Sequence, residues 1–237
     1  IGFAMTIIAL LLPVGRLADL VGLKKVYIAG SLVLILGAII AGASNNLVIL
    51  ILSRIVQGAG AAMTQGTGMA IIIAAFPPRE RGKAIGLIMT MVGAGAIAGP
   101  AVGGLLVDAL GWRSVFFANV PLVAAGVVLG LAVLADQPVE QRLQSGQKQG
   151  FDWLGALLSS LALLVFLIAI SNAHRIGWLS PPILAAGVSF LVLLVTFIWW
   201  EERCSSPMLD VGFFRRLTFS LGVSAAFLTF LGSSATL

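Results

Sequence analysis

Residues able to carry out acid–base or metal chemistry are scarce in this chain. Charged side chains make up 10% of its 237 residues, against about 25% in soluble domains. The one cysteine, Cys204, cannot close an internal disulfide, and no metal-ligand spacing surrounds it. The one histidine, His174, stands beside Arg175 in what we expect to be a short outer loop without an acid nearby. We therefore expect no cofactor and no metal, and a membrane-embedded lipid-modifying enzyme is a poorly supported alternative.

Hydrophobic residues dominate instead. They make up 59% of the chain and give a mean hydropathy of +1.10, which excludes an ordinary soluble domain. Crossing a bilayer takes about 20 apolar residues, and such runs lie at 1–14, 25–43, 47–75, 84–107, 115–135, 153–171, 180–200 and 217–237. The pattern predicts an all-α membrane protein with about eight transmembrane helices, the first and last truncated. Because the chain opens inside an apolar run without Met or a basic start, we expect a fragment of a longer protein with no secretory signal.

Basic residues indicate the side of the membrane on which each connector lies. Every second connector is basic, and together these hold eleven basic residues, whereas the alternate connectors hold only Arg113 and Arg175. Basic connectors favour the cytoplasmic side, so the net charge of +5 is a topology signal and does not indicate a nucleic-acid partner. Tryptophans occur at the expected span ends, where amphipathic rings prefer the interface: Trp112, Trp153, Trp178, Trp199 and Trp200.

A polar connector at 136–152 divides the chain. It is rich in Gln and contains Gly146 and Gly150, a composition typical of flexible linkers. Asp152 ends it just before an apolar run, where a carboxylate is suited to cap a helix. A later segment at 207–216 places apolar residues beside two arginines, so we expect it to lie along the cytoplasmic surface.

Arg54 is the most costly residue to place in the membrane. It lies roughly 10 Å by helical rise into the run at 47–75, and an intramembrane arginine costs at least about 2.5 kcal/mol. Gln57 follows on the same helix face, and Gly58 and Gly60 allow a neighbouring helix to approach closely. Snorkelling of Arg54 to the outer interface is one explanation, but the polar face favours a cavity lined by Arg54 and Gln57.

The connector GRLADLVGLKK at 15–25 joins the first two runs. We expect a tight cytoplasmic turn in which Gly15 and Gly22 supply backbone freedom. Asp19, its one acid, is suited to cap the next helix, to pair with Arg16, or to act as a latch that breaks and re-forms between two states. The residues alone leave these alternatives open.

A row of glycines lies along one face of the run at 84–107. The row consists of Gly86, Gly95, Gly99, Gly103 and Gly104. Such a face lets another helix backbone approach closely, and Pro100 removes one donor from the helix and bends it. Static packing explains a single pair of spaced glycines, but the longer row favours a bendable helix at a sliding contact.

Three of these motifs resemble those of the major facilitator superfamily. The connector at 15–25 resembles its loop motif, although Leu20 and Leu23 stand where basic residues are usual. LSRIVQGAGAA at 52–62 is similar to its fourth-helix motif, and the glycine row with Pro100 matches the fifth-helix motif associated with antiporters. A further set of residues resembles the start of the sixth helix in the fourteen-helix drug:proton antiporter branch: Gly111, Trp112, Arg113, Phe116, Phe117, Asn119 and Pro121.

The resemblance implies the major facilitator fold in three parts. Residues 1–135 would form helices two to six of the N-terminal half, and 136–200 a cytoplasmic linker with two extra transmembrane helices. Residues 201–237 would form a connector and the start of the C-terminal half. In this family an acid on the first helix is the usual proton carrier, and no carboxylate lies deep within any apolar run here.

The implied function is proton-coupled efflux of drugs or similar amphipathic molecules by alternating access. The partners would be a small-molecule substrate, protons and the lipid bilayer of a bacterial inner membrane, with the full-length protein a monomer. Arg54 and Gln57 would couple protons, and the glycine row would join the two halves. The alternative is a same-fold exporter of a lipid, siderophore or sugar. A cytoplasmic latch would be formed by Gly15, Arg16, Asp19, Gly22, Lys24 and Lys25.

Overall fold

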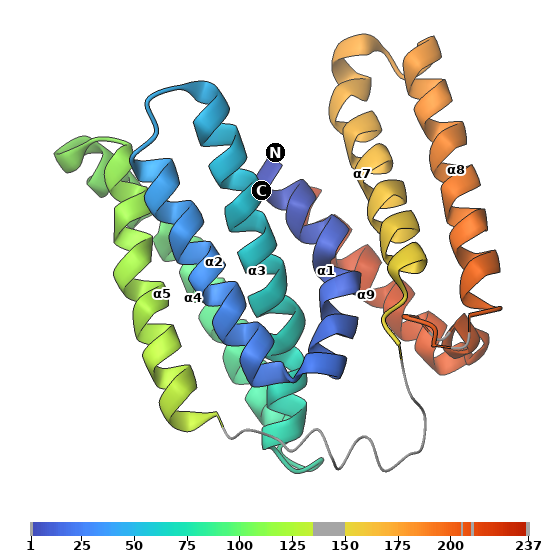
Figure 1. The fold of residues 1–237 in the computed structure, drawn as a ribbon, viewed down its shortest axis with the longest axis horizontal. Coiled ribbons are helices and arrows are strands. Elements are labelled where there is room, and N and C mark those ends of the chain that lie inside the picture. The colour runs from blue at the N-terminus through green and yellow to red at the C-terminus, as the bar shows by residue number, and fades with distance from the viewer. Residues whose placement is uncertain (1, 135–149, 205, 210, 236–237) are drawn as a thin grey trace.

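The computed structural model describes residues 2–134, 150–204, 206–209 and 211–235, and within them every regular element is helical (Figure 1). Most of the predicted linker, including Arg142, Gly146 and Lys148, lies outside the described residues. The elements are α1 (Gly2–Val21), α2 (Leu23–Gly42), α3 (Leu47–Ala75), α4 (Arg81–Leu110), α5 (Arg113–Val133), α7 (Trp153–Ile176), α8 (Pro181–Glu201), the 3-10 helix η1 (Val211–Arg215) and α9 (Leu217–Ala235).

The helices confirm an all-α membrane fold. Across the described residues, seven helices are long and apolar enough to cross a membrane, and α9 adds a shorter apolar stretch, Leu217–Thr229. The five tryptophans all lie in the first or last turn of a long helix or just outside it. The hydropathy pattern therefore located the helices, with shifts of a few residues at most ends.

The prediction of a tight turn over 15–25 is wrong, because the turn is much shorter than that. α1 continues as a helix through Gly15, Arg16 and Asp19, and the chain turns only at Gly22, which has φ +114°. That conformation is costly for residues with a Cβ, so one glycine is needed for the turn and Gly15 is not. Charged side chains ended the apolar run without ending the helix, because at the interface they extend into water.

The outer loop expected around His174 is also wrong. α7 extends to Ile176, so His174 and Arg175 lie in its last turn, and the chain leaves the helix at Gly177. The His174 side chain is exposed there. Basic side chains are favourable at this position because the C-terminal end of a helix carries partial negative charge.

Helix α3 packs closely against α1 and α2 because glycines stand at the contacts (Figure 1). A Cβ added to Gly60 would stand 2.5 Å from the Leu34 backbone nitrogen of α2, and one added to Gly37 would stand 2.6 Å from Gln57 Cγ. At Gly58 the same atom would meet the Phe3 carbonyl oxygen of α1 at 2.7 Å. These three helices, together with α5 against α2, form the best-packed part of the molecule.

The α7–α8 hairpin is attached to α1 through a carbonyl group that a proline leaves free. Pro13 has no N–H, so it cannot donate to the Ala9 carbonyl one turn earlier in α1. The Ser160 hydroxyl of α7 donates to that oxygen at 2.8 Å, and Ala9 is 2% exposed. Because a buried carbonyl needs a donor in an apolar environment, this hydrogen bond specifies where α7 packs.

Two buried carboxylates, Asp152 and Glu201, fasten the end of the hairpin at which α7 begins and α8 ends. Asp152 caps α7 as predicted, accepting from the Gly155 backbone nitrogen at 2.9 Å. The Trp200 indole nitrogen donates to both Asp152 carboxylate oxygens at 3.0 Å. Glu201 accepts from the Met208 backbone nitrogen at 2.9 Å, which ties the following connector to α8.

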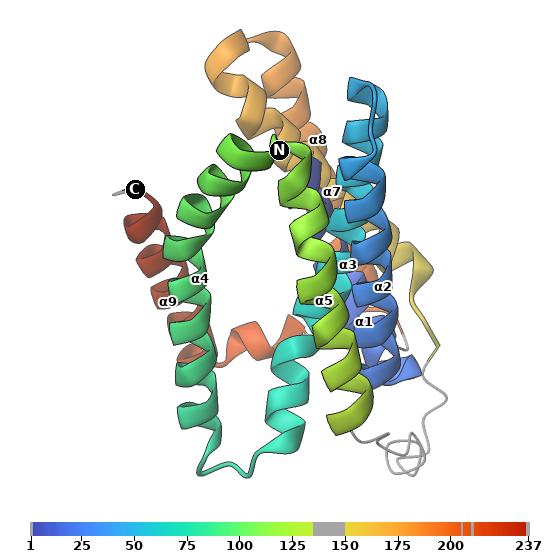
Figure 2. The ribbon, with the colours of Figure 1, turned by 90° about the vertical axis from the view of Figure 1, so that its left-hand side faces the viewer.

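Helix α4 stands apart from the packed group. Figure 2 shows it separated from α5 over most of its length, and none of its residues, all of them described, is buried. An apolar helix without protein cover faces either lipid or another part of the protein.

Candidate functional site

Arg54 lies on α3 between aromatic rings of two neighbouring helices. Its guanidinium carbon is 4.5 Å from the centroid of the Phe116 ring on α5 and 5.9 Å from that of Phe3 on α1. Its Nη1 donates to the Gln57 side-chain oxygen at 3.1 Å. The ring faces attract a cation electrostatically, so Arg54 is positioned without needing a carboxylate partner.

Arg54 and Gln57, the two predicted members of this site, differ in how far they are buried. Gln57 is 2% exposed and packs against Gly37 of α2, so its side chain is fixed. Arg54 itself is exposed in this chain. A fixed amide that holds an accessible guanidinium is suited to present a positive charge to a solute or to an acid on another helix.

The N-terminal end of α3 is stabilised by local hydrogen bonds. The Asn46 side chain caps α3 by accepting from the Ile49 backbone nitrogen at 2.8 Å. Arg113, at the start of α5, donates to the Ser44 carbonyl at 2.8 Å. The turn between α2 and α3 is therefore tied to α5, which also carries Phe116, so the elements around Arg54 are held in register.

The residues of the predicted latch lie on two consecutive helices. Gly15, Arg16 and Asp19 are in the last two turns of α1, and Lys24 and Lys25 are in the first turn of α2. Gly22 is the N-cap residue of α2, so the alternative in which Asp19 caps that helix is wrong. Within the described part of the chain, the Arg16 Nε atom is buried and has no hydrogen-bond partner.

The glycine row has no neighbour in the described part of the chain. An added Cβ at Gly86, Gly95, Gly99, Gly103 or Gly104 would meet no described atom within 4 Å. Pro100 lies inside α4, and the helix continues through it. The small-residue face is therefore available to a helix that is not among those described.

Carboxylates of the described helices all lie near helix ends, as the sequence indicated. Asp19, Asp108 and Glu201 are in the last turns of α1, α4 and α8.

Sequence reasoning missed several residues that position the site. Phe116 belongs to a sequence motif, but no local pattern relates it or Phe3 to Arg54, because their contacts join residues far apart in the chain. A signal did exist for Ser160, since Pro13 frees a carbonyl in α1 that must find a donor. The sequence does not say which of the many serines supplies it.

Comparison with known proteins gives a consistent picture. The family model described as the Major Facilitator Superfamily matches residues 1–236. The chain is 32% identical over 223 residues to the multidrug resistance protein Stp of Mycobacterium tuberculosis, covering 94% of this chain and 40% of that protein. It is 32% identical over 231 residues to the methylenomycin A resistance protein of Bacillus subtilis, covering 97% and 47%.

A third similar protein is named as a transporter and not as a resistance protein. The riboflavin transporter RibZ of Clostridioides difficile is 30% identical over 220 residues, covering 93% of this chain and 46% of that protein. The chain thus spans less than half the length of the curated relatives it matches.

Proposed function

The chain belongs to the major facilitator superfamily, and on that premise we propose that it is part of a secondary transporter that exports amphipathic small molecules in exchange for protons. Family membership makes it a multi-pass membrane transporter rather than an enzyme. The names of two similar proteins, a multidrug resistance protein and a methylenomycin A resistance protein, support an export role and a bacterial inner membrane.

The observation that carries the proposal is the setting of Arg54. A guanidinium held by Gln57 and flanked by Phe3 and Phe116 is a fixed, accessible positive charge on a transmembrane helix. Such residues are retained in membranes at an energetic cost, usually because they face a solute pathway. Arg54 would lower the proton affinity of a carboxylate brought near it and release that proton when the pathway reorganises.

Two further parts fit alternating access. The Nε atom of Arg16 is buried and has no hydrogen-bond partner among the described residues, and it would find an acceptor in the other conformer. Residues 15–25 would then form a latch that opens and closes. The uncovered glycine face of α4, with Pro100 as its bend, would pack against the C-terminal half. In this arrangement residues 1–135 form most of the N-terminal half, and 136–200 contribute the linker and the two extra helices.

The test uses the full-length protein in proteoliposomes under an imposed pH gradient, with ethidium as the transported cation. Arg54→Ala should reduce gradient-driven movement to the level of protein-free liposomes while insertion stays normal. Arg54→Lys keeps the charge but loses the planar donor group, so we expect an intermediate rate. Arg175→Ala, on the outer end of α7, is the matched control. Normal gradient-driven transport by the Arg54→Ala protein would contradict the proposed coupling role.

A second candidate is an exporter of the same fold with a narrower cargo. One relative of comparable identity is named as a riboflavin transporter, so similarity over this segment does not select drugs as substrates. Gradient-driven transport of ethidium, riboflavin, a lipid, a siderophore and a sugar, each measured separately, distinguishes the two candidates. Gradient-dependent movement of one panel member without ethidium transport would favour the narrower exporter.

A further inference from the structure

Arg16, in the last two turns of α1, carries a donor that the surrounding residues leave unsatisfied. Its Nε atom is buried and has no hydrogen-bond partner among the described residues. A buried donor without an acceptor is destabilising, and the penalty is larger for a charged group. A movement of α1 that brought an acceptor to this atom would therefore be favourable.

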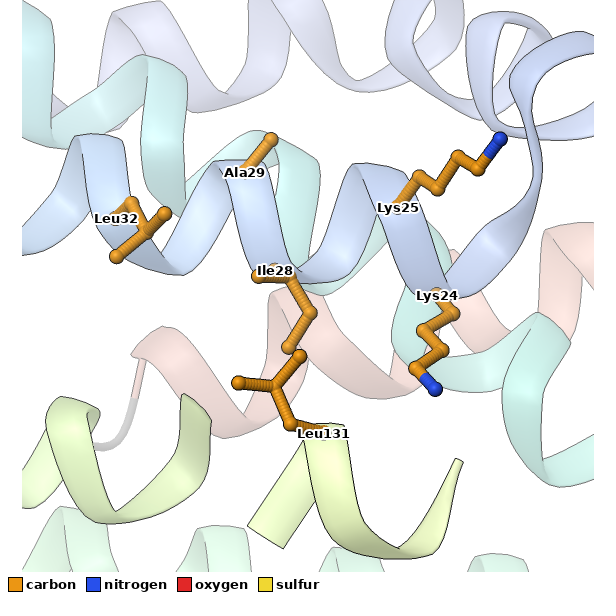
Figure 3. Close-up of a pocket in the computed structure, with 6 residues that line it drawn as sticks. All are labelled: Lys24, Lys25, Ile28, Ala29, Leu32 and Leu131. Carbon is orange, nitrogen blue, oxygen red and sulfur yellow. The ribbon is translucent and has the colours of Figure 1, made fainter. Parts of the chain in front are cut away.

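The residues on either side of the turn after α1 do not provide this acceptor. Asp19 is one turn further along α1, but its side chain is exposed, whereas the Arg16 Nε atom is buried. The first turn of α2 contains two cations, Lys24 and Lys25, and no acid. Figure 3 shows these two side chains on opposite sides of α2, beside a crevice of about 460 Å³ between α2 and α5. The candidates for the acceptor are therefore on other helices.

Arg16 and the start of α7 lie at the same end of the contact between α1 and α7. These helices run in opposite directions (Figure 1) and are joined by the hydrogen bond from Ser160 to the Ala9 carbonyl. From that bond, Arg16 is seven residues further along α1, and Gly155 is five residues back along α7. These intervals are about 10 Å and about 8 Å by helical rise, so both lead toward the place where α7 begins and α8 ends.

Glu201 is an acid that this arrangement brings near Arg16. It is the last residue of α8 and is 3% exposed, and the charges that act on it include those of Arg16 and Asp152. Its Oε1 atom also lies beside α7, 3.3 Å from the point at which a Cβ on Gly155 would stand. Glu201 thus lies where α1, α7 and α8 meet.

The Glu201 carboxylate can accept a further donor. It accepts from the Met208 backbone nitrogen at 2.9 Å, and the Leu209 backbone also hydrogen-bonds to it. An ionised carboxylate offers about four acceptor positions, so a guanidinium is accommodated without releasing the connector after α8. Asp152 is committed to the hairpin instead, since it caps α7 and accepts from the Trp200 indole nitrogen.

We propose that Glu201 is the acceptor that Arg16 binds when the latch over residues 15–25 closes. This pairing rests on the proposed function of 15–25 as a latch, and it gives the latch a partner on the α7–α8 hairpin. A charge-assisted hydrogen bond is roughly twice as strong as a neutral one, and Glu201 is shielded from water. The bond would therefore hold the end of α1 to the hairpin in one conformer and leave it free in the other.

The experiment is double electron–electron resonance on the full-length protein in lipid nanodiscs. Spin labels are attached at Val21→Cys and Arg203→Cys in a Cys204→Ser background, because both labelled positions are exposed. The labels report the separation between the end of α1 and the end of α8. We expect two distance populations, of which the shorter belongs to the closed latch.

Neutral variants of the two partners test the pairing. Arg16→Gln should deplete the shorter population about tenfold, as expected for the loss of one hydrogen bond between charged groups. Glu201→Gln keeps an oxygen for the Met208 N–H, so it removes the charge without releasing the connector, and it should cause the same depletion. The double variant should lose no more than either single variant, because both remove the same interaction.

Neighbouring acids provide the controls. Glu202→Gln removes an exposed acid whose partner is Arg215 at 4.0 Å, and it should leave both populations unchanged. Retention of the shorter population by the Arg16→Gln or Glu201→Gln protein, or a further loss in the double variant, would overturn the proposal. Depletion by Asp152→Asn without depletion by Glu201→Gln would overturn it as well, and would assign the acceptor to Asp152.

The same preparations are also assayed for gradient-driven ethidium transport in proteoliposomes. Two distance populations with the expected depletion, but no transport by the unmodified protein, would reject the proposed export of amphipathic cations and support the pairing. Gradient-driven transport with a single distance population that none of the variants changes would do the reverse.

Discussion

The hydrogen bond between Ser160 and the Ala9 carbonyl makes a sharp prediction about how the extra hairpin is attached. Ser160→Ala removes the donor that replaces the missing N–H of Pro13. A buried acceptor without a partner costs about 1–3 kcal/mol, while interhelical hydrogen bonds in membranes average about 0.6 and reach about 1.7 kcal/mol. Because Ala9 is 2% exposed, we expect a loss of about 1 kcal/mol in the free energy of unfolding.

The assay is unfolding in mixed micelles titrated with sodium dodecyl sulfate, followed by tryptophan fluorescence. Trp153 and Trp200 lie at the end of the hairpin where α7 begins and α8 ends, so their fluorescence reports on its detachment. Ser159→Ala is the matched control, because that buried hydroxyl donates to Ala156 of its own helix at 3.1 Å. Its removal leaves the helix hydrogen bonds intact, so we expect a change of only a few tenths of a kcal/mol.

A double-mutant cycle tests whether the missing N–H of Pro13 is the reason that the Ser160 hydrogen bond matters. Pro13→Ala restores the backbone N–H that donates to the Ala9 carbonyl, so the carbonyl no longer depends on Ser160. In the P13A background, Ser160→Ala should then cost close to nothing, which gives a coupling energy of about 1 kcal/mol. An equal loss in both backgrounds would refute the reasoning and assign the Ser160 effect to side-chain packing alone.

Further predictions concern substitutions at Gly60, Gly22, Gly15 and Gly99, with Gly68 as a control. Gly60→Ala should cost about 1–3 kcal/mol in the same unfolding assay by pushing α2 away from α3, whereas Gly68→Ala, with no described atom within 4 Å, should be neutral. Gly22→Ala should cost about 1–2 kcal/mol because of its positive φ, while Gly15→Ala in the helix should be neutral or stabilising. Gly99→Val should leave the stability of these helices unchanged and abolish transport in the proteoliposome assay, whereas wild-type rates would show that the glycine row of α4 is passive.

Much of the candidate site could be predicted from the sequence, because the free-energy cost of placing an arginine in the membrane is apparent from the residue and the apolar run around it. A guanidinium in an apolar run is conspicuous without knowledge of its neighbours, and Gln57 lies within reach because helix geometry fixes residues three apart. Phe3 and Phe116 could not be assigned to it, since they come from helices at either side of α3 in sequence. Their placement depends on how α1 and α5 pack, which no local pattern encodes.

Charged residues in the sequence do not by themselves mark where the chain reverses direction. Arg16 and Asp19 ended the first apolar run, yet the α1 backbone continues beyond them to Val21. The interface tolerates charged side chains on a continuing helix, so hydropathy marks the membrane boundary and not the helix end. The change of direction instead occurs at the glycine that can adopt a positive φ, Gly22.

The sequence by itself determined that this protein is a bundle of membrane helices, roughly where each begins, and which connectors are basic. It could do so because transfer from water to lipid depends on each segment's own composition. Only the tertiary structure decided which helices meet: α3 packs on α2 through Gly37 and Gly60, α7 packs on α1 through Ser160, and the other described residues leave α4 uncovered. Lipid tails are as apolar as the side chains of these helices, so helix partners are selected by close packing and by hydrogen bonds between residues distant in the chain.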